Sequence, residues 1–121
     1  MTKPLVVIGH RMGQGNKVKT GVENAGGTAI VIEGMLADMK LGEVMNEHNA
    51  DLGISFCGSG GAGAITAAND FGYEAVDHLR SVDEGVSAIK NGKQVLGFGF
   101  MDTEELGEQL TKTWLEVHSD E

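Results

Sequence analysis

The sequence predicts one α/β domain of three layers, in which helices cover both faces of a five-stranded, mostly parallel sheet. Short, continuously apolar runs alternate along the chain with segments of helical spacing, the pattern of a parallel sheet with helical crossovers. The chain has 121 residues, enough for a single hydrophobic core. Nineteen glycines stand beside one proline, and only 5% of residues are aromatic, so small and aliphatic side chains must fill that core. We therefore expect residues 1–121 to form a single domain.

The strands are predicted from five short apolar runs, each bounded by glycine or polar residues. Runs of this length without polar alternation are typical of strands that are buried on both faces. The fourth run is short and contains Glu74, which weakens its prediction. The five predicted strands are residues 5–8, 28–32, 52–56, 73–76 and 95–98.

Helices are predicted in the segments that follow the strands. The last segment has the clearest pattern, because its apolar residues recur at steps of four, four and three; they are Leu106, Leu110, Trp114 and Val117. Gly42 weakens the second segment. The predicted helices are residues 14–24, residues 35–49, the stretch after the glycine-rich loop, the stretch between Ser81 and Gly92, and the stretch after Asp102.

Capping signals mark two of these helices. Ser81 and Glu84 have the spacing of a capping box, and Gly92 ends the same helix. Asp102 precedes Glu105 by three residues, so we expect Asp102 to cap the last helix rather than to act in catalysis. The resulting βαβαβαβαβα order, with its short connections, predicts a doubly wound, flavodoxin-like arrangement.

Charge and composition exclude several classes of partner. Nine Lys and Arg residues against eighteen Asp and Glu residues give a formal charge of −9, which opposes binding to nucleic acid. No run approaches the roughly 18 apolar residues of a membrane span, so we expect a cytoplasmic protein without membrane insertion. Cys57 is the single cysteine, and neither His48 nor His118 has a spaced partner, so we expect no metal and no cofactor.

Cys57 begins the most informative segment of the chain, the glycine-rich loop of residues 57–63, which has four glycines in the six residues after Cys57. Parallel α/β sheets bind ligands beyond the carboxyl ends of their strands, where this loop is expected to lie. Backbone N–H groups and a helix N-terminus at this place favour an anion and the thiolate form of Cys57. The alternative is that the glycines only allow close packing and that Cys57 is a small buried apolar residue. The predicted ligand-binding residues of the loop are Gly58, Ser59, Gly60, Gly61 and Gly63.

His10 and Arg11 follow the first strand, and the doubly wound order places them beside Cys57. We expect His10 to be an acid–base partner of Cys57 and Arg11 to anchor an anion. The alternative for His10 is a polar loop residue that is satisfied by backbone groups. His78 ends the fourth strand at the same edge of the sheet and is a further candidate for ligand binding.

The stretch Ile54-Ser55-Phe56-Cys57-Gly58-Ser59-Gly60-Gly61-Ala62-Gly63 resembles the bacterial glycine-rich family that is named after its Ser-Phe-Cys-Gly-Ser motif. The resemblance covers essentially the whole chain. It implies no mechanism, because no activity is established for that family.

A more distant resemblance joins the stretch from Asp51 to Asn69 to type B ribose-5-phosphate isomerases and galactose-6-phosphate isomerase subunits. This resemblance implies that Cys57 is the base that moves a proton between adjacent sugar carbons. It implies further that Gly58, Ser59 and Gly60 stabilise the enediolate and that Asn69 lies at the ligand site. The last helix offers Lys112 where that family has arginines, which leaves Arg11, Lys17 or Arg80 to bind a phosphate.

Three functional hypotheses follow from these residues. The first is an isomerase-like enzyme of carbohydrate metabolism that acts on a small anionic sugar derivative with Cys57 as base. The second is a non-catalytic subunit that binds a small anion or serves in an assembly, and the third is a cysteine phosphocarrier of a sugar phosphotransferase type. We also expect a homo-oligomer, a dimer or higher, with Trp114 and the methionines filling either core gaps or a subunit interface.

Overall fold

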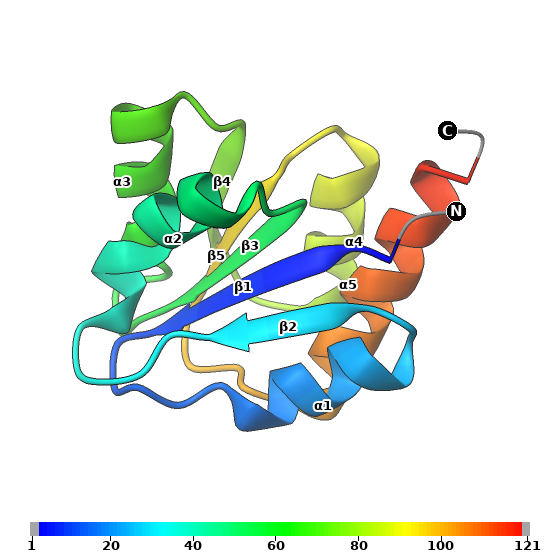
Figure 1. The fold of residues 1–121 in the computed structure, drawn as a ribbon, viewed down its shortest axis with the longest axis horizontal. Coiled ribbons are helices and arrows are strands. Elements are labelled where there is room, and N and C mark those ends of the chain that lie inside the picture. Colours follow the sequence, from blue (N-terminus) through cyan, green and yellow to red (C-terminus); the bar gives the residue numbers. More distant parts are fainter. Residues whose placement is uncertain (1–2, 120–121) are drawn as a thin grey trace.

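The computed structural model describes residues 3–119. They form three layers, a five-stranded parallel sheet with helices on both of its faces (Figure 1). The strands are β1 (Leu5–His10), β2 (Thr28–Val31), β3 (Leu52–Phe56), β4 (Ala75–Leu79) and β5 (Val95–Phe98). The helices are α1 (Asn16–Asn24), the 3₁₀ helix η1 (Ala37–Lys40), α2 (Leu41–His48), α3 (Ala62–Phe71), α4 (Val82–Lys90) and α5 (Glu104–Val117). The predicted α/β class is confirmed, and every strand pair is parallel.

The strand order across the sheet is β2-β1-β3-β5-β4. The chain turns back between β1 and β3, which makes this pair the topological switch point where ligands bind in open α/β sheets. Compared with the flavodoxin order, the last two strands are exchanged, because the crossover from β3 passes β5 and leaves β4 at the edge.

The two faces of the sheet carry different cores. Helices α1, α4 and α5 cover one face, where Phe56 and Phe98 supply the largest buried side chains. Helices α2 and α3, with η1, cover the other face, where Ala37, Ala64 and Ala67 keep the helices close to the sheet. The small-residue composition is therefore concentrated on the face that carries α3 and the loop before it.

The fourth strand lies at residues 75–79, whereas the sequence predicted residues 73–76. Its pairing with β5 is irregular between Val76 and Leu79, and His78 has a left-handed backbone conformation with φ +61°. An edge strand has a single neighbouring strand, so polar residues and a bulge are tolerated there. The expectation of a continuous apolar run therefore missed the end of β4.

The second predicted helix is divided in two. Leu36, with φ +62°, begins the short η1, and the α-helix begins only at Leu41. Gly42 nevertheless lies inside α2, where a Cβ atom would come within 2.9 Å of the Ala67 backbone in α3. The glycine that weakened the helix prediction allows α2 and α3 to pack closely.

The caps confirm one expectation and correct another. The Ser81 hydroxyl accepts the Glu84 N–H at 3.1 Å, as the capping signal predicted. The cap of α5 is Thr103, whose hydroxyl accepts the Leu106 N–H at 3.2 Å. Asp102 instead accepts the Val18 N–H at 3.1 Å, so it satisfies a backbone donor in the first turn of α1.

The methionines divide between core and surface. Met45 is fully buried, and Met101 is partly buried against the core that contains Phe56 and Phe98. Met12, Met35 and Met39 are exposed. Within residues 3–119, no helix combines the length and the apolar character that crossing a membrane requires.

Candidate functional site

The carboxyl ends of β1, β3 and β5 meet at one edge of the sheet. The Arg11 N–H donates to the Phe56 carbonyl at 2.8 Å, and the Cys57 N–H donates to the Phe98 carbonyl at 3.2 Å. These bonds continue the ladders beyond the strand ends, so the loop after β1 lies beside Cys57 as the doubly wound order predicted.

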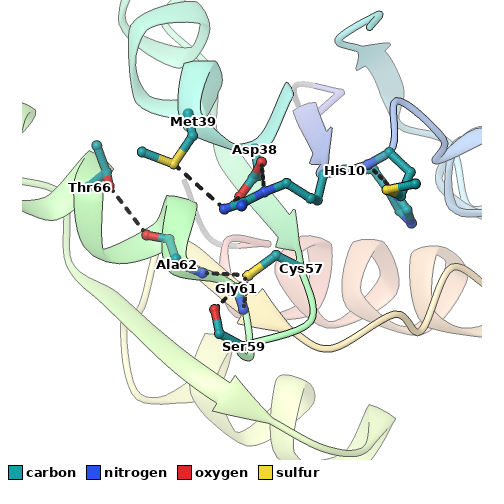
Figure 2. Close-up of polar contacts among 10 residues, drawn as sticks. His10, Asp38, Met39, Cys57, Ser59, Gly61, Ala62 and Thr66 are labelled. Carbon is teal, nitrogen blue, oxygen red and sulfur yellow. Dashed lines mark hydrogen bonds and ion pairs between the residues drawn. The ribbon is translucent and has the colours of Figure 1, made fainter. Parts of the chain in front are cut away.

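The Cys57 thiol is surrounded by hydrogen-bond donors (Figure 2). Its Sγ atom accepts the N–H groups of Gly61 and Ala62, each at 3.2 Å, and lies 3.1 Å from the Ser59 hydroxyl. Gly61 and Ala62 form the start of α3, where backbone N–H groups have no acceptor within the helix. The sulfur therefore occupies the position of an anion at a helix N-terminus.

The surroundings of Cys57 favour its ionised form. Burial by itself disfavours the thiolate, since only 1% of the residue is exposed. The hydrogen bonds from the Ser59 hydroxyl and from the Ala62, Ser59 and Gly61 backbone amides outweigh burial, and the pKa of Cys57 lies below its ordinary value. Cys57 is thus buried, as the packing alternative expected, but its sulfur also accepts hydrogen bonds that favour the thiolate.

Close packing accounts for part of the glycine content. A Cβ atom on Gly61 would overlap the backbone of Gly97, and one on Gly63 would overlap the Asp38 carbonyl. Gly60 has φ +97° and donates its N–H to the Cys57 carbonyl at 3.1 Å. Gly58 differs, because a Cβ atom there would meet only the edge of Phe100. The amides of Gly60 and Gly61 already have acceptors, and Ser59 contacts the Cys57 sulfur, so a ligand could use the Gly58 amide directly and the Ser59 hydroxyl only if that side chain turns away from the sulfur.

A row of small residues lies under this loop. Gly9, Ser55 and Gly97 are register partners on β1, β3 and β5. Their small side chains leave space on the α2 and α3 side of the sheet, which the backbones of η1 and of Gly61 occupy. The Ser55 hydroxyl is fully buried there and makes no hydrogen bond among the described residues.

Arg11 forms a two-pronged ion pair with Asp38. Its Nε and Nη2 atoms donate to the two carboxylate oxygens at 2.8 and 2.7 Å. The Asp38 side chain is fully buried, whereas a third of the Arg11 side chain is exposed. The hydrogen bond and the charge of Asp38 raise the pKa of Arg11 against the effect of burial. Arg11 lies where an anion anchor was expected, but it is already paired.

His10 is the last residue of β1 and not a loop residue. Its side chain is buried beside the rings of Phe56 and Phe100, whose centroids lie 5.7 and 5.0 Å from its own. Its Nδ1 atom accepts the Met12 N–H at 3.0 Å, and burial lowers its pKa. The structure places no hydrogen bond between His10 and Cys57, because alternate residues of a strand point to opposite faces. The structure therefore shows no direct contact for the expected acid–base pair of His10 and Cys57.

A shallow pocket of about 440 Å³ lies between the glycine-rich loop and the end of β4. It is lined by Gly58, Ser59, Gly60, His78, Leu79, Arg80 and Gly99. The His78 N–H donates to the Gly60 carbonyl at 2.8 Å, and its Nδ1 atom lies 2.9 Å from an Asp77 oxygen. We call this hollow the loop pocket. It joins Ser59 of the loop to two basic side chains, those of His78 and Arg80.

Asn69 is not part of this assembly. It lies on the exposed surface of α3, seven residues after the first residue of the helix. At 1.5 Å per residue, that spacing places it about 10 Å along the helix from the loop. The helix that follows the glycines carries this side chain away from Cys57.

Asp38 is the site residue that sequence reasoning missed. It lies 27 positions after Arg11, in a segment predicted as helix, and no local pattern marks an acid that will be buried. Its one sequence signal is an acid between the apolar residues Ala37 and Met39. Among residues 3–119, no group of three or more His, Cys, Asp or Glu side chains is arranged to hold a metal ion.

The sequence profile of the glycine-rich SFCGS family matches residues 5–117. The chain belongs to this family. The match confirms the resemblance that was based on the Ser-Phe-Cys-Gly-Ser motif. No curated protein matches the sequence.

Solved structures of type B ribose-5-phosphate isomerases share the fold of this SFCGS protein. The enzyme of Trypanosoma brucei gives a TM-score of 0.71 at 22% identity, covering 95% of this chain and 87% of that chain. The enzyme of Giardia lamblia gives 0.69 at 18% identity, covering 93% and 94%. The enzyme of Thermotoga maritima gives 0.61 at 19% identity, covering 94% and 87%. The expected likeness to these isomerases is therefore confirmed for the fold.

Proposed function

We propose that this SFCGS protein is an isomerase-like enzyme in which Cys57 moves a proton between adjacent carbons of a sugar phosphate or a sugar acid. The observation that carries the proposal is the Cys57 sulfur, held by two backbone amides and the Ser59 hydroxyl at the start of α3. A thiolate in a site that largely excludes water is a suitable base for a C–H group next to a carbonyl.

The proton transfer follows from this arrangement. The thiolate takes a proton from the carbon next to the substrate carbonyl and becomes a thiol. The electron pair of the C–H bond forms the C=C bond of an enediolate, and the negative charge moves to the former carbonyl oxygen. The hydroxyl proton of the deprotonated carbon moves to the former carbonyl oxygen, so that this hydroxyl becomes the new carbonyl. Return of the proton from Cys57 to the former carbonyl carbon completes the isomerisation. The Gly58 amide and the Ser59 hydroxyl are the donors we assign to the oxyanion.

The loop pocket is the place we propose for the substrate. Arg80 is exposed at its rim, and its guanidinium has no hydrogen-bond partner in residues 3–119. The His78 imidazole is oriented by Asp77 and is 66% exposed. A phosphate or carboxylate at Arg80 and His78 leaves the carbonyl end of a small sugar near Ser59. The Ser59 side chain must then turn aside for a substrate carbon to reach the Cys57 sulfur.

The experiment that tests the proposal is NMR-detected uptake of deuterium from heavy water at the carbon next to the carbonyl. A panel of sugar phosphates and sugar acids is incubated with the wild-type protein and with Cys57→Ser, in which a hydroxyl still accepts the amides of α3. We expect uptake in at least one compound, with a loss of 100-fold or more in Cys57→Ser. Arg80→Gln is expected to weaken substrate binding, and Lys90→Gln at the exposed end of α4 is the matched charge control.

The burial of Cys57 favours a second candidate function. With 1% of the residue exposed, the thiol has no open path to a ligand in this conformation. A protein that only binds a small anion in the loop pocket needs no such path. Chemical shift changes at Gly58 and His78 on addition of phosphate or a sugar acid, without deuterium uptake at any compound, would establish this second function and reject the first.

A further inference from the structure

Arg11 is fixed at its backbone and at its side chain. Its N–H donates to the Phe56 carbonyl at 2.8 Å, and its own carbonyl accepts the Leu36 N–H at 2.7 Å. Its guanidinium donates two bonds to Asp38. An arginine held at these points is not free to reach into the loop pocket for a ligand. Its charge therefore acts on groups close to its present position.

The segment that carries Asp38 lies against two glycines from different elements. A Cβ atom on Gly9 of β1 would come within 3.0 Å of the Ala37 carbonyl oxygen and of the Asp38 Cα atom. A Cβ atom on Gly63 of α3 would overlap the Asp38 carbonyl. The missing side chains let η1 pack between β1 and the first turn of α3. That same turn supplies the Ala62 amide that holds the Cys57 sulfur, as Figure 2 shows.

Arg11 and Cys57 lie on the same face of the sheet. Gly9 and Ser55 are register partners, and Arg11 and Cys57 each lie two residues further along the chain, so both follow the same alternation. His10 and Phe56 point to the other face. The charges that raise the pKa of Arg11 are those of Asp38 and, to a smaller extent, of the Cys57 thiolate.

We infer that Arg11, positioned by Asp38, is the counter-ion of the Cys57 thiolate and not an anchor for the anionic group of a ligand. The inference deepens the proposed function and rests on it, since it adds a positive charge to the hydrogen bonds that favour the ionised base. It also separates two cations by role: Arg11 acts on the sulfur from the η1 side, whereas Arg80 faces the loop pocket.

The test is the pH dependence of Cys57 alkylation by iodoacetamide, which needs no substrate and no turnover. We expect Arg11→Gln to raise the midpoint of the profile by about half a pH unit, because removal of a nearby positive charge disfavours the thiolate. Arg11→Lys retains the positive charge and should stay within about 0.3 unit of wild type. Lys90→Gln removes a charge from the exposed end of α4 and should leave the midpoint unchanged.

Other titratable and charged groups surround this end of the sheet and remain the same in all these variants. They are His10 on β1, Asp38 on η1, Asp77 and His78 on β4, and Arg80 and Asp102 in the loops. A difference between Arg11→Gln and Arg11→Lys therefore reports the charge of residue 11. An unchanged midpoint in Arg11→Gln, or an equal rise in both variants, would overturn the inference.

Removal of Arg11 leaves Asp38 buried without its partner, so Arg11→Gln can unfold. The double variant Arg11→Met with Asp38→Leu replaces the ion pair by apolar side chains of similar size, a change that buried pairs often tolerate. A smaller rise in the midpoint than in Arg11→Gln is expected, because the double variant also removes the negative charge of Asp38, which disfavours the thiolate. A cooperative thermal transition is the folding check. A second readout is phosphate binding, which Arg80→Gln should weaken and the double variant should retain.

The two proposals can fail separately. Absence of deuterium exchange in the wild-type protein would reject the proposed reaction, and the alkylation profile would still decide the role of Arg11.

Discussion

The backbone of Gly61 lies against that of Gly97, and neither position has room for a Cβ atom. Gly61 is the N-cap of α3 and donates its N–H to the Cys57 sulfur, while Gly97 is in the middle of β5. This contact sets the distance between the sheet and the first turn of α3. Packing between two glycines therefore decides how closely the backbone amides approach the thiol.

Gly97→Ala tests this relationship. The new methyl group must displace the backbone of Gly61, and overpacking of this kind costs about 1–3 kcal/mol of folding stability. The displaced amide weakens its bond to Cys57, so we expect the alkylation midpoint of the thiol to rise as well. Urea denaturation and iodoacetamide kinetics measure the two effects.

Gly99→Ala is the matched control, because a Cβ atom at residue 99 would meet nothing within 4 Å. We expect Gly99→Ala to resemble wild type in both measurements. Equal losses in Gly97→Ala and Gly99→Ala would show that the contact with Gly61 is not what matters.

Ser59→Ala separates activation of the thiol from access to it. The Ser59 hydroxyl is the strongest of the groups that lower the pKa of Cys57, so its removal should raise the alkylation midpoint by roughly half a pH unit. The same change uncovers the sulfur, so the rate at high pH should not fall. Ser87→Ala, at an exposed position on α4, is the control. A rise in the midpoint with a lower plateau rate would contradict this account.

His10 should make folding stability depend on pH. Burial lowers its folded-state pKa below the ordinary value near 6.5, so the unfolded chain takes up a proton at a higher pH than the native protein does. The stability from neutral His10 is complete above about pH 6.5 and declines as the pH falls toward the folded-state value. For one proton the slope cannot exceed about 1.4 kcal/mol per pH unit.

We expect His10→Asn, which keeps an acceptor for the Met12 N–H, to reduce the loss of stability between pH 7 and pH 5. Urea denaturation at several pH values measures the slope. His48→Gln, at an exposed position on α2, should retain the slope of wild type. If the two variants behave alike, burial of His10 is not the source of the slope.

The expected homo-oligomer remains a prediction. Exposed apolar side chains gather in the loops after β1 and β2, at Met12, Met35 and Leu36, with Met39 in η1. Water-exposed patches of this kind often mark protein contacts. Light scattering after size-exclusion chromatography should give at least twice the 12.7 kDa of the chain. Monomers alone at micromolar concentration would reject the prediction.

The sequence by itself determined the elements whose signals are local. Continuous apolar runs marked the three central strands and the edge strand β2, because strands covered on both faces need no polar alternation. Ser81 marked the start of α4, because a capping hydroxyl and the backbone N–H that donates to it lie three residues apart. The sequence also assigned the glycine-rich loop to the end of β3, because strand, loop and helix follow one another directly in the chain.

The tertiary structure decided which side chains meet. Arg11 and Asp38 are 27 positions apart, and no periodicity relates them; the glycines at residues 9 and 63 allow η1 to come between β1 and α3. His10 and Arg11 are adjacent in sequence but point to opposite faces, and the length of β1 decides which of them shares a face with Cys57. Local hydrogen bonds and side-chain spacing are encoded by neighbouring residues, whereas contacts between elements depend on register and on the space left by packing.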